Sequence, residues 1–285
     1  MAPGGSGDLN ARRLAEALRP RIGQSVVVEN RAGGGGNIAA TSAAAATPDG
    51  YTLFFASEQI FTVNPHISNN LPFKLEDFHP LALISKTPHI LLVNTTLPAH
   101  SIAELVAYAK GRSSPLLFGS GGVGTSPHLA GELFKGQAGI NLQHVPYRGA
   151  SLSLTALMSN EIQLLFDSTL TALGHMRGGR SRGLAIANAT RLAIAPDLPT
   201  LTESGYPGFE AGVTHGLLLP AATPAPRVAA LSKAINEVLN DPAYRKQMAD
   251  AGAQVVGGTP ESFRVYLITE RKKWAEVIKR QNIKF

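Results

Sequence analysis

The groups best suited to chemistry in this sequence are main-chain N–H groups, which the glycine-rich stretch 119–126 brings together. The apolar run 116–118 predicts a strand, and glycines follow at 119, 121, 122 and 124. Thr-Ser-Pro at 125–127 is typical of a helix start, because a hydroxyl residue caps the first turn and proline needs no N–H there. The N–H groups of the turn and the helix dipole favour negative charge. The stretch therefore predicts an anion site, and we expect a small carboxylate there.

A nucleotide is the alternative ligand for this stretch. Residues 119–124 match G-x-G-x-x-G, the dinucleotide fingerprint. That fingerprint also needs an acidic residue about 20 positions further on to hold a ribose, and the segment 140–149 contains none. A Walker A loop needs G-K-[ST], which does not follow either. The sequence thus disfavours a nucleotide, and no cofactor is expected.

Few side chains offer catalytic or metal chemistry. Asp167 ends the apolar run 162–166, where it could cap the next helix, face a ligand, or do both. His128 and Glu132 have the i, i+4 spacing of a metal pair, but no third ligand is evident, so we expect ordinary helix positions and no metal. The chain has no Cys and no G-x-S-x-G elbow. No convincing nucleophile–base pair emerges, so we expect a binding protein and keep an α/β enzyme that uses the same anion hole as the alternative.

Strands and helices alternate along the chain, which predicts an α/β fold built from βαβ units. In the first half we expect strands at 25–29, 51–55, 81–85 and 90–93. In the second half we expect them at 116–118, 142–145, 162–166 and 183–187. Ligands of such sheets bind beyond the carboxyl ends of strands. The loops at those ends are 2–8, 57–59, 119–126, 147–149 and 167–169, and we expect them to converge on a cleft between two lobes. We place lobe 1 at residues 1–96 and 219–285, and lobe 2 at 97–218.

The loop Ala2–Asp8 has the same glycine-rich character as 119–126. We expect Asp8 to cap a helix that runs to about Leu18. In α/β folds such a loop follows a strand, and no strand precedes it in this sequence. Either the chain begins at a site loop, or a leading strand has been lost.

Composition narrows the class of protein. The 285 residues are 44% hydrophobic and 16% charged, with a net charge of +6. The basic residues are scattered and have few aromatic neighbours, which favours an ordinary solvated surface over a nucleic-acid interface. No apolar run approaches the ~18–20 residues of a membrane span, and no signal peptide is evident.

Several segments resemble the Bug family, the substrate-binding proteins of tripartite tricarboxylate transporters. They are VVVENRAGGGGNIAA (26–40), PDGYTL (48–53), GVGTSPHLAGELFK (122–135), HVPYRGAS (144–151) and LPTLTESGYPGFE (198–210). The resemblance implies a two-lobed periplasmic-binding-protein fold of type II with mixed, mostly parallel sheets. It implies a ligand that is a di- or tricarboxylate, an acidic amino acid or an aromatic acid. It also implies a monomer in the periplasm whose partners are the membrane subunits of a transporter, or a sensor.

The family pattern assigns ligand contacts to residues of this chain. Backbone N–H groups and waters hold one carboxylate, Asp167 selects ligands that carry an amino group, and the loop at Ser57 shapes the far end of the ligand. The expected ligand-binding residues are Pro3, Gly4, Gly5, Gly7, Asp8, Ser57, Glu58, Ser120, Gly122, Gly124, Thr125, Ser126, His128, Tyr147, Arg148, Gly149 and Asp167. The chain departs from the pattern at Glu58 and at 214–216, and we do not recognise, ahead of Ala2, the leader and first strand of lobe 1 that the pattern places there.

Overall fold

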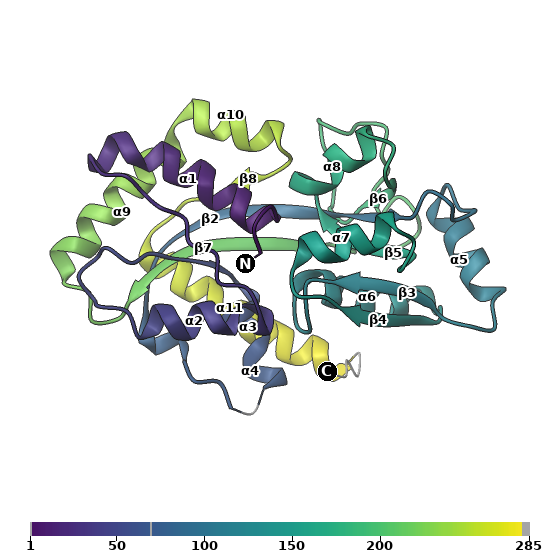
Figure 1. Ribbon diagram of the computed structural model, residues 1–285, viewed down its shortest axis with the longest axis horizontal. Coiled ribbons are helices and arrows are strands. Elements are labelled where there is room, and N and C mark those ends of the chain that lie inside the picture. Colours follow the sequence, from purple (N-terminus) through teal and green to yellow (C-terminus); the bar gives the residue numbers. More distant parts are fainter. Residues whose placement is uncertain (1, 69, 281–285) are drawn as a thin grey trace. The chain divides into compact units, whose positions relative to one another are not determined.

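The structure is a computed structural model that describes residues 2–68 and 70–280. The chain divides into two compact units (Figure 1). Unit 1 comprises residues 1–86, 214–250 and 254–285, and unit 2 comprises 87–213 and 251–253. Two strands, β2 (Phe78–Val93) and β7 (Gly212–Pro220), carry the chain from one unit to the other.

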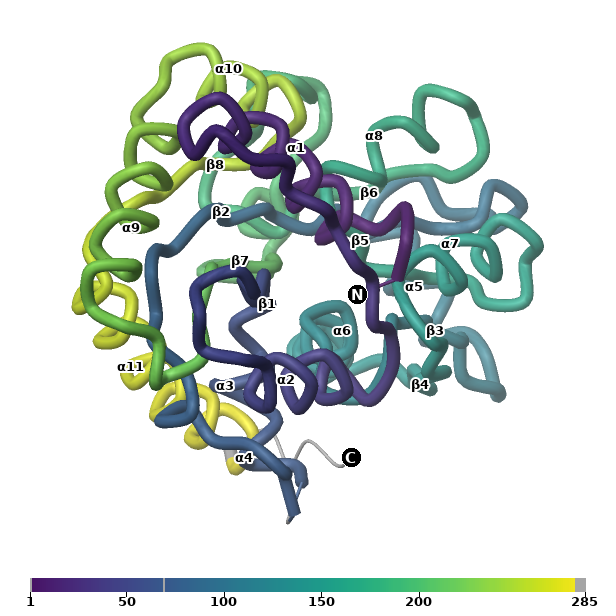
Figure 2. Tube along the Cα trace, turned by 60° about the vertical axis from the view of Figure 1, so that its left-hand side comes forward, coloured from purple at the N-terminus to yellow at the C-terminus, as the bar shows by residue number. Residues whose placement is uncertain are grey.

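Unit 1 is an α/β unit whose helices enclose short strands (Figure 2). In chain order it contains α1 (Ser6–Ile22), η1 (Gly34–Gly36), α2 (Asn37–Ala44), β1 (Phe54–Ser57), α3 (Gln59–Thr62), α4 (Asn64–Ile67), η2 (Leu75–Asp77), α9 (Ala225–Asn240), α10 (Pro242–Asp250), β8 (Gln254–Val255) and α11 (Pro260–Arg280). β1 pairs antiparallel with β7, and β8 pairs antiparallel with β2. Aromatic side chains form much of its core, with Phe54, Phe61 and Phe78 in mutual contact.

Unit 2 has a mixed sheet covered by helices. It contains α5 (Ile102–Lys110), β3 (Leu116–Ser120), α6 (Ser126–Ala138), β4 (Leu142–Pro146), α7 (Ala150–Met158), β5 (Leu164–Ser168), α8 (Thr169–Arg177) and β6 (Arg182–Ile186). β3 lies between β4 and β5 and is parallel to both. β2 pairs antiparallel with β5 and β6. The α/β class and the mixed sheets agree with the sequence prediction.

Local signals predicted most elements of unit 2 to within a few residues. Ser101 caps α5 by accepting a hydrogen bond from the Glu104 N–H at 3.2 Å, as its spacing to Glu104 predicts. Thr125 precedes α6 in an extended conformation, and Pro127 lies in the first turn of that helix. The residues at the start of these two helices determine where each helix begins, so the local sequence is enough to predict them.

Three predictions for the first half of the chain were wrong. The segment 25–29 forms no strand; within the described residues, 25–28 make no main-chain hydrogen bond that could define one. β1 begins at Phe54 rather than at Tyr51. The predicted strands 81–85 and 90–93 are one continuous strand, β2, because Ser85 pairs with Val255 while His89 pairs with Ser168 across the intervening proline.

Candidate anion-binding site

Three parallel strands of unit 2 end at one edge of its sheet, and each is followed by a helix. β4, β3 and β5 lie in this order, with Ser120 level with Pro146 and Gly119 level with Leu165. The chain then enters α7, α6 and α8, so three helix N-termini lie beyond the same strand ends (Figure 1). Each N-terminus presents main-chain N–H groups that have no carbonyl partner within the helix. The three helix N-termini therefore make this edge electropositive.

The turn between β3 and α6 requires glycine. Gly122 has φ 135° and Gly124 has φ 77°, conformations that side chains with a Cβ rarely adopt. A Cβ on Gly121 would lie 3.0 Å from the Ala150 nitrogen, so this turn packs directly against the start of α7. The glycines that the sequence singled out thus bring two helix N-termini together.

Only some of the main-chain N–H groups of this turn are available to a ligand. The Gly122 N–H donates to Ser120 Oγ at 3.1 Å, the Gly124 N–H donates to His128 Nδ1 at 3.2 Å, and the Thr125 N–H donates to the Gly122 oxygen at 3.3 Å. These three groups hold the turn in shape and are not available to a ligand.

The N–H groups of Gly121, Val123 and Ser126 remain open, because they donate to no atom of the described residues. We call these three N–H groups the unit 2 cradle. They lie in a turn whose shape is already set by its own hydrogen bonds, so a ligand would not have to order it.

Two histidines support the cradle rather than charging it. His128 and His144 stack with ring centroids 3.9 Å apart. Burial lowers the pKa of His128 to about 3 and that of His144 to about 4, so both rings are neutral near pH 7. His144 Nε2 lies 2.6 Å from Ser120 Oγ, and the Ser120 hydroxyl donates to the Gly122 oxygen at 2.9 Å. Ser120 is fully buried and committed to the turn, so this Ser–His contact does not expose a nucleophile.

A third histidine, which sequence reasoning missed, holds the first residue of α6. The Ser126 hydroxyl donates to the Gly212 oxygen, and His89 Nε2 lies 2.7 Å from the same hydroxyl oxygen. Burial lowers the pKa of His89 to about 3, so its ring is neutral. Because the Ser126 proton goes to the Gly212 oxygen, His89 Nε2 is the donor to Ser126 Oγ. Ser126 is therefore anchored to both β2 and β7 within unit 2, a link that no local sequence signal could indicate.

Asp167 lies at the end of β5 and is almost wholly buried. It does not cap α8; Ser168 does, by accepting the Leu170 N–H at 3.4 Å. The Thr171 hydroxyl donates to Asp167 Oδ2 at 2.6 Å. Burial raises the pKa of Asp167 to about 6, although the hydrogen bond from Thr171 opposes this.

The next predicted ligand-binding residues, 147–149, follow β4. The Tyr147 hydroxyl donates to Glu161 Oε1 at 2.7 Å, while Arg148 is exposed. Gly149 has φ 123° and precedes the first residue of α7. Their predicted role in ligand binding stays a prediction.

The predicted loop of unit 1 is largely closed by its own contacts. α1 begins at Ser6, so Asp8 lies inside the first turn rather than at the cap. The Gly4 N–H donates to Asp8 Oδ2 at 2.9 Å, and Arg12 lies 3.0 Å from Asp8 Oδ1. Burial disfavours the charge, but the Gly4 N–H and Arg12 together hold the pKa of Asp8 below its usual value. Pro3 is exposed, whereas Gly5 and Gly7 are buried.

Glu58 lies in a buried polar cluster of unit 1. The Tyr266 hydroxyl of α11 donates to Glu58 Oε2 and is 3.3 Å from Thr214 Oγ1. Gln59 Nε2 donates to Glu58 Oε1 at 3.3 Å, and Ser57 bonds to Gln59. Burial raises the pKa of Glu58 to about 7, with the Tyr266 hydrogen bond opposing it. Both carboxyl oxygens therefore have protein partners, and neither Tyr266 nor Thr214 was among the predicted residues.

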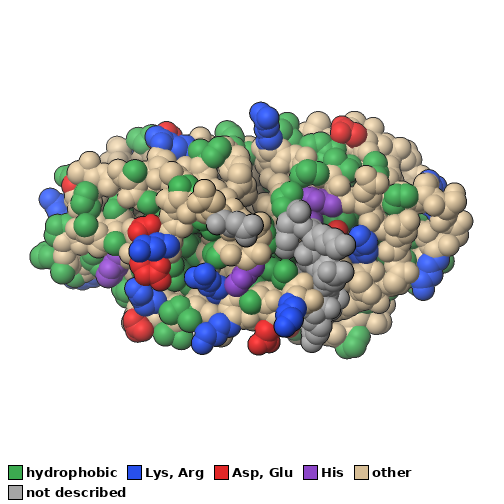
Figure 3. All heavy atoms as spheres, turned by 90° about the horizontal axis from the view of Figure 1, so that it is seen from below, with side chains coloured by type: hydrophobic (Ala, Val, Ile, Leu, Met, Phe, Trp, Pro, Cys, Tyr) green, Lys and Arg blue, Asp and Glu red, His purple; other side chains and the backbone are tan. Residues whose placement is uncertain are grey.

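Metal and membrane features are not evident in the part of the chain that the structure describes. No three His, Cys, Asp or Glu side chains gather there as metal ligands would. None of its helices is both long and apolar enough to span a bilayer. On the face drawn in Figure 3, basic side chains are interspersed with acidic ones and form no continuous patch.

The fold defines a class: the protein has the two-lobed type II fold of periplasmic solute-binding proteins. The chain is similar to the periplasmic binding protein BugD, with a TM-score of 0.94 and 33% identity over 99% of this chain and 95% of that one. The family model for the tripartite tricarboxylate transporter family receptor matches residues 10–283. The chain belongs to this family.

Two further structures that are similar to this chain contain ligands. Rpa4515 of R. palustris with adipate has a TM-score of 0.96 and 31% identity over 100% of this chain and 95% of its own. MatC of Rhodopseudomonas palustris with bound malate has a TM-score of 0.90 and 29% identity over 97% of this chain and 96% of its own.

Proposed function

We propose that this protein captures a small organic acid carrying at least two carboxylates and delivers it to the membrane subunits of a tripartite tricarboxylate-type transporter. The observation that carries the proposal is the unit 2 cradle, in which three open N–H groups lie at a helix N-terminus. A carboxylate only accepts hydrogen bonds and is stabilised by the positive end of a helix dipole. The neutral histidines around the cradle add no charge of their own.

The relatives support this ligand class, because adipate and malate are both dicarboxylates. The BugD relative supports a periplasmic location. We also propose that the protein acts as a monomer, and that it carries its ligand and is not an enzyme. The predicted contact of the same ligand with the loop Pro3–Asp8 stays a prediction that variants of that loop test.

Asp167 is the proposed selector among acids. An ionised carboxylate near the strand ends favours a ligand that also carries an ammonium group. Replacing Asp167 with Asn should therefore improve binding of adipate relative to glutamate. An unchanged ratio of the two dissociation constants contradicts this role.

Isothermal titration calorimetry with adipate, malate, citrate, glutamate and benzoate tests the main proposal. We expect saturable heat with at least one of the polycarboxylates and a weaker response to the monocarboxylate benzoate. A folded protein that gives no heat with any of them refutes the proposal. After prolonged incubation, NMR spectra of the bound acid should show no new product, and product formation would favour the enzyme alternative.

A further inference from the structure

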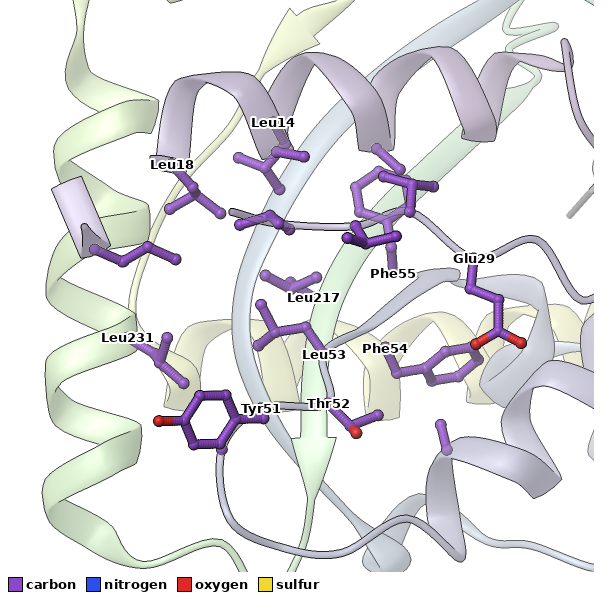
Figure 4. A pocket seen from close by; sticks show the side chains of 18 of the residues that line it. Leu14, Leu18, Glu29, Tyr51, Thr52, Leu53, Phe54, Phe55, Leu217 and Leu231 are labelled. Atoms are coloured by element: carbon purple, nitrogen blue, oxygen red, sulfur yellow. The ribbon is translucent and has the colours of Figure 1, made fainter. Parts of the chain in front are cut away.

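Unit 1 contains a pocket of about 740 Å³ with walls from α1, α2, α9 and β1, and most of the residues that line it are apolar. Leu14 and Leu18 project into it from α1, and Leu231 faces it from α9 (Figure 4). The guanidinium of Arg21 in its wall is already paired with Asp241. Such walls solvate a carboxylate poorly, so the unit 2 cradle suits the charge of an acid better than this pocket does.

The polar side chains of the turn 119–128 are all committed to the protein. The Ser120 and Thr125 hydroxyls both donate to a main-chain oxygen of the turn, at 2.9 and 2.7 Å. Ser126 and His128 are engaged by the hydrogen bonds described above, and the other residues of the turn are glycine, valine and proline. The donors that this fully described turn offers to a ligand are therefore main-chain N–H groups. These suit an oxygen that only accepts hydrogen bonds, as a carboxylate oxygen does.

The side chains that are exposed beside the cradle are apolar. Val123 supplies one of the three open N–H groups and is 39% exposed, whereas the other residues of 119–128 are buried or half-buried. Leu152 is 51% exposed in the first turn of α7, and the start of α7 packs against the turn at Gly121. Because the Cβ atoms of a helix tilt toward its N-terminus, Leu152 leans toward the strand ends where the cradle lies.

A carboxylate in the cradle brings its own carbon chain next to these side chains. Its oxygen lies about 2.9 Å from a donor nitrogen, so its first methylene lies within about 6 Å of the Val123 nitrogen. That carbon loses water when the ligand binds. Apolar neighbours favour a CH₂ group at this place over a CHOH group, because a desolvated hydroxyl needs a hydrogen-bond partner for its own proton.

We infer that Val123 and Leu152 determine the specificity of the cradle: they contact the carbon chain of the ligand and select aliphatic dicarboxylates without hydroxyl groups over hydroxylated ones. This inference rests on the proposed function. Succinate and adipate belong to the favoured class, and malate, which is succinate with one hydroxyl added, belongs to the disfavoured one. The N–H groups hold either acid by its carboxylate, so the discrimination comes from the two side chains.

Isothermal titration calorimetry with succinate and malate tests the inference, because these two acids differ by one hydroxyl. Adipate and galactarate, its tetrahydroxy counterpart, form a longer pair. In each pair that binds, we expect the wild type to bind the acid without hydroxyls about tenfold or more tightly than its counterpart. Val123→Thr keeps the size of the side chain and the main-chain N–H. It should lower this ratio to about threefold or less, because the new hydroxyl gives the ligand hydroxyl a partner.

A second variant and a control complete the test. Leu152→Asn should lower the ratio in the same direction, which keeps the inference testable if Val123→Thr does not fold. Val265→Thr, the same substitution at a 52% exposed valine of α11, is the matched control and should leave the ratio unchanged.

The outcomes separate this inference from the proposed function. Equal affinities of the wild type for both members of a pair would overturn the inference and leave the proposed function standing. A ratio that neither Val123→Thr nor Leu152→Asn lowers would do the same. A folded wild type that binds none of the four acids would instead refute the proposed function.

Discussion

Replacing Glu58 with Gln should remove a pH-dependent loss of stability. Burial raises the pKa of this carboxyl to about 7 from 4.5, a difference worth roughly 3 kcal/mol. The folded state has the higher pKa, so Glu58 contributes stability below about pH 4.5 that is lost as the pH rises through 7. The amide that replaces the carboxyl cannot ionise, and its oxygen can still accept the Tyr266 hydroxyl bond.

Urea unfolding between about pH 4.5 and 8 measures this effect. The free energy of unfolding of the wild type should fall, relative to that of Glu58→Gln, by roughly 3 kcal/mol across this range. Asp167, whose pKa burial also raises, is present in both proteins and contributes the same background. Glu276→Gln, at an exposed position of α11, is the control and should follow the wild type. Parallel curves for wild type and Glu58→Gln would refute the buried-carboxyl interpretation.

Three further substitutions test packing and the cradle. Gly216→Ala places a Cβ against the ring of Phe263 and should lower the free energy of unfolding by about 1–3 kcal/mol. The control Gly174→Ala, in α8, places its Cβ in open space and should leave this free energy unchanged. Equal melting temperatures of the two variants would contradict this prediction. Arg182→Lys loses guanidinium bonds to the Leu97, Ala99 and Thr95 carbonyls and should cost about 1–3 kcal/mol in urea unfolding, and an unchanged midpoint would contradict it. Gly121→Ala pushes its Cβ against the Ala150 nitrogen and should weaken adipate binding about tenfold by calorimetry while the protein stays folded; undiminished affinity would show that this turn does not touch the ligand.

The sequence predicted elements that carry local start and stop signals. α6 begins after Thr-Ser-Pro, as expected, and α5 begins after a serine cap, a signal of the same local kind. The segment 25–29 has the right composition for a strand but forms none, because a strand needs a hydrogen-bonding neighbour that composition cannot supply. The predicted strands 81–85 and 90–93 form one strand, β2, because they pair with β8 and β5, and these partners are distant in the chain.

The candidate site was predictable in outline and not in detail. Glycine spacing correctly indicated the turn before α6, since positive φ at Gly122 and Gly124 demands glycine. Which N–H groups stay open depends on His128 and Ser120, whose side chains turn back onto the loop. His89 reaches Ser126 from a strand 37 residues away in the chain, and only the folded structure brings such pairs together.

The most direct test of the carboxylate cradle is a ¹⁵N–¹H NMR titration of the labelled protein with adipate. The amide signals of Gly121, Val123 and Ser126 should shift downfield together and saturate, because each N–H gains a charged acceptor. The Gly122 and Gly124 amides, already bonded within the turn, should move less. Saturable binding that leaves the three cradle amides in place would contradict the account.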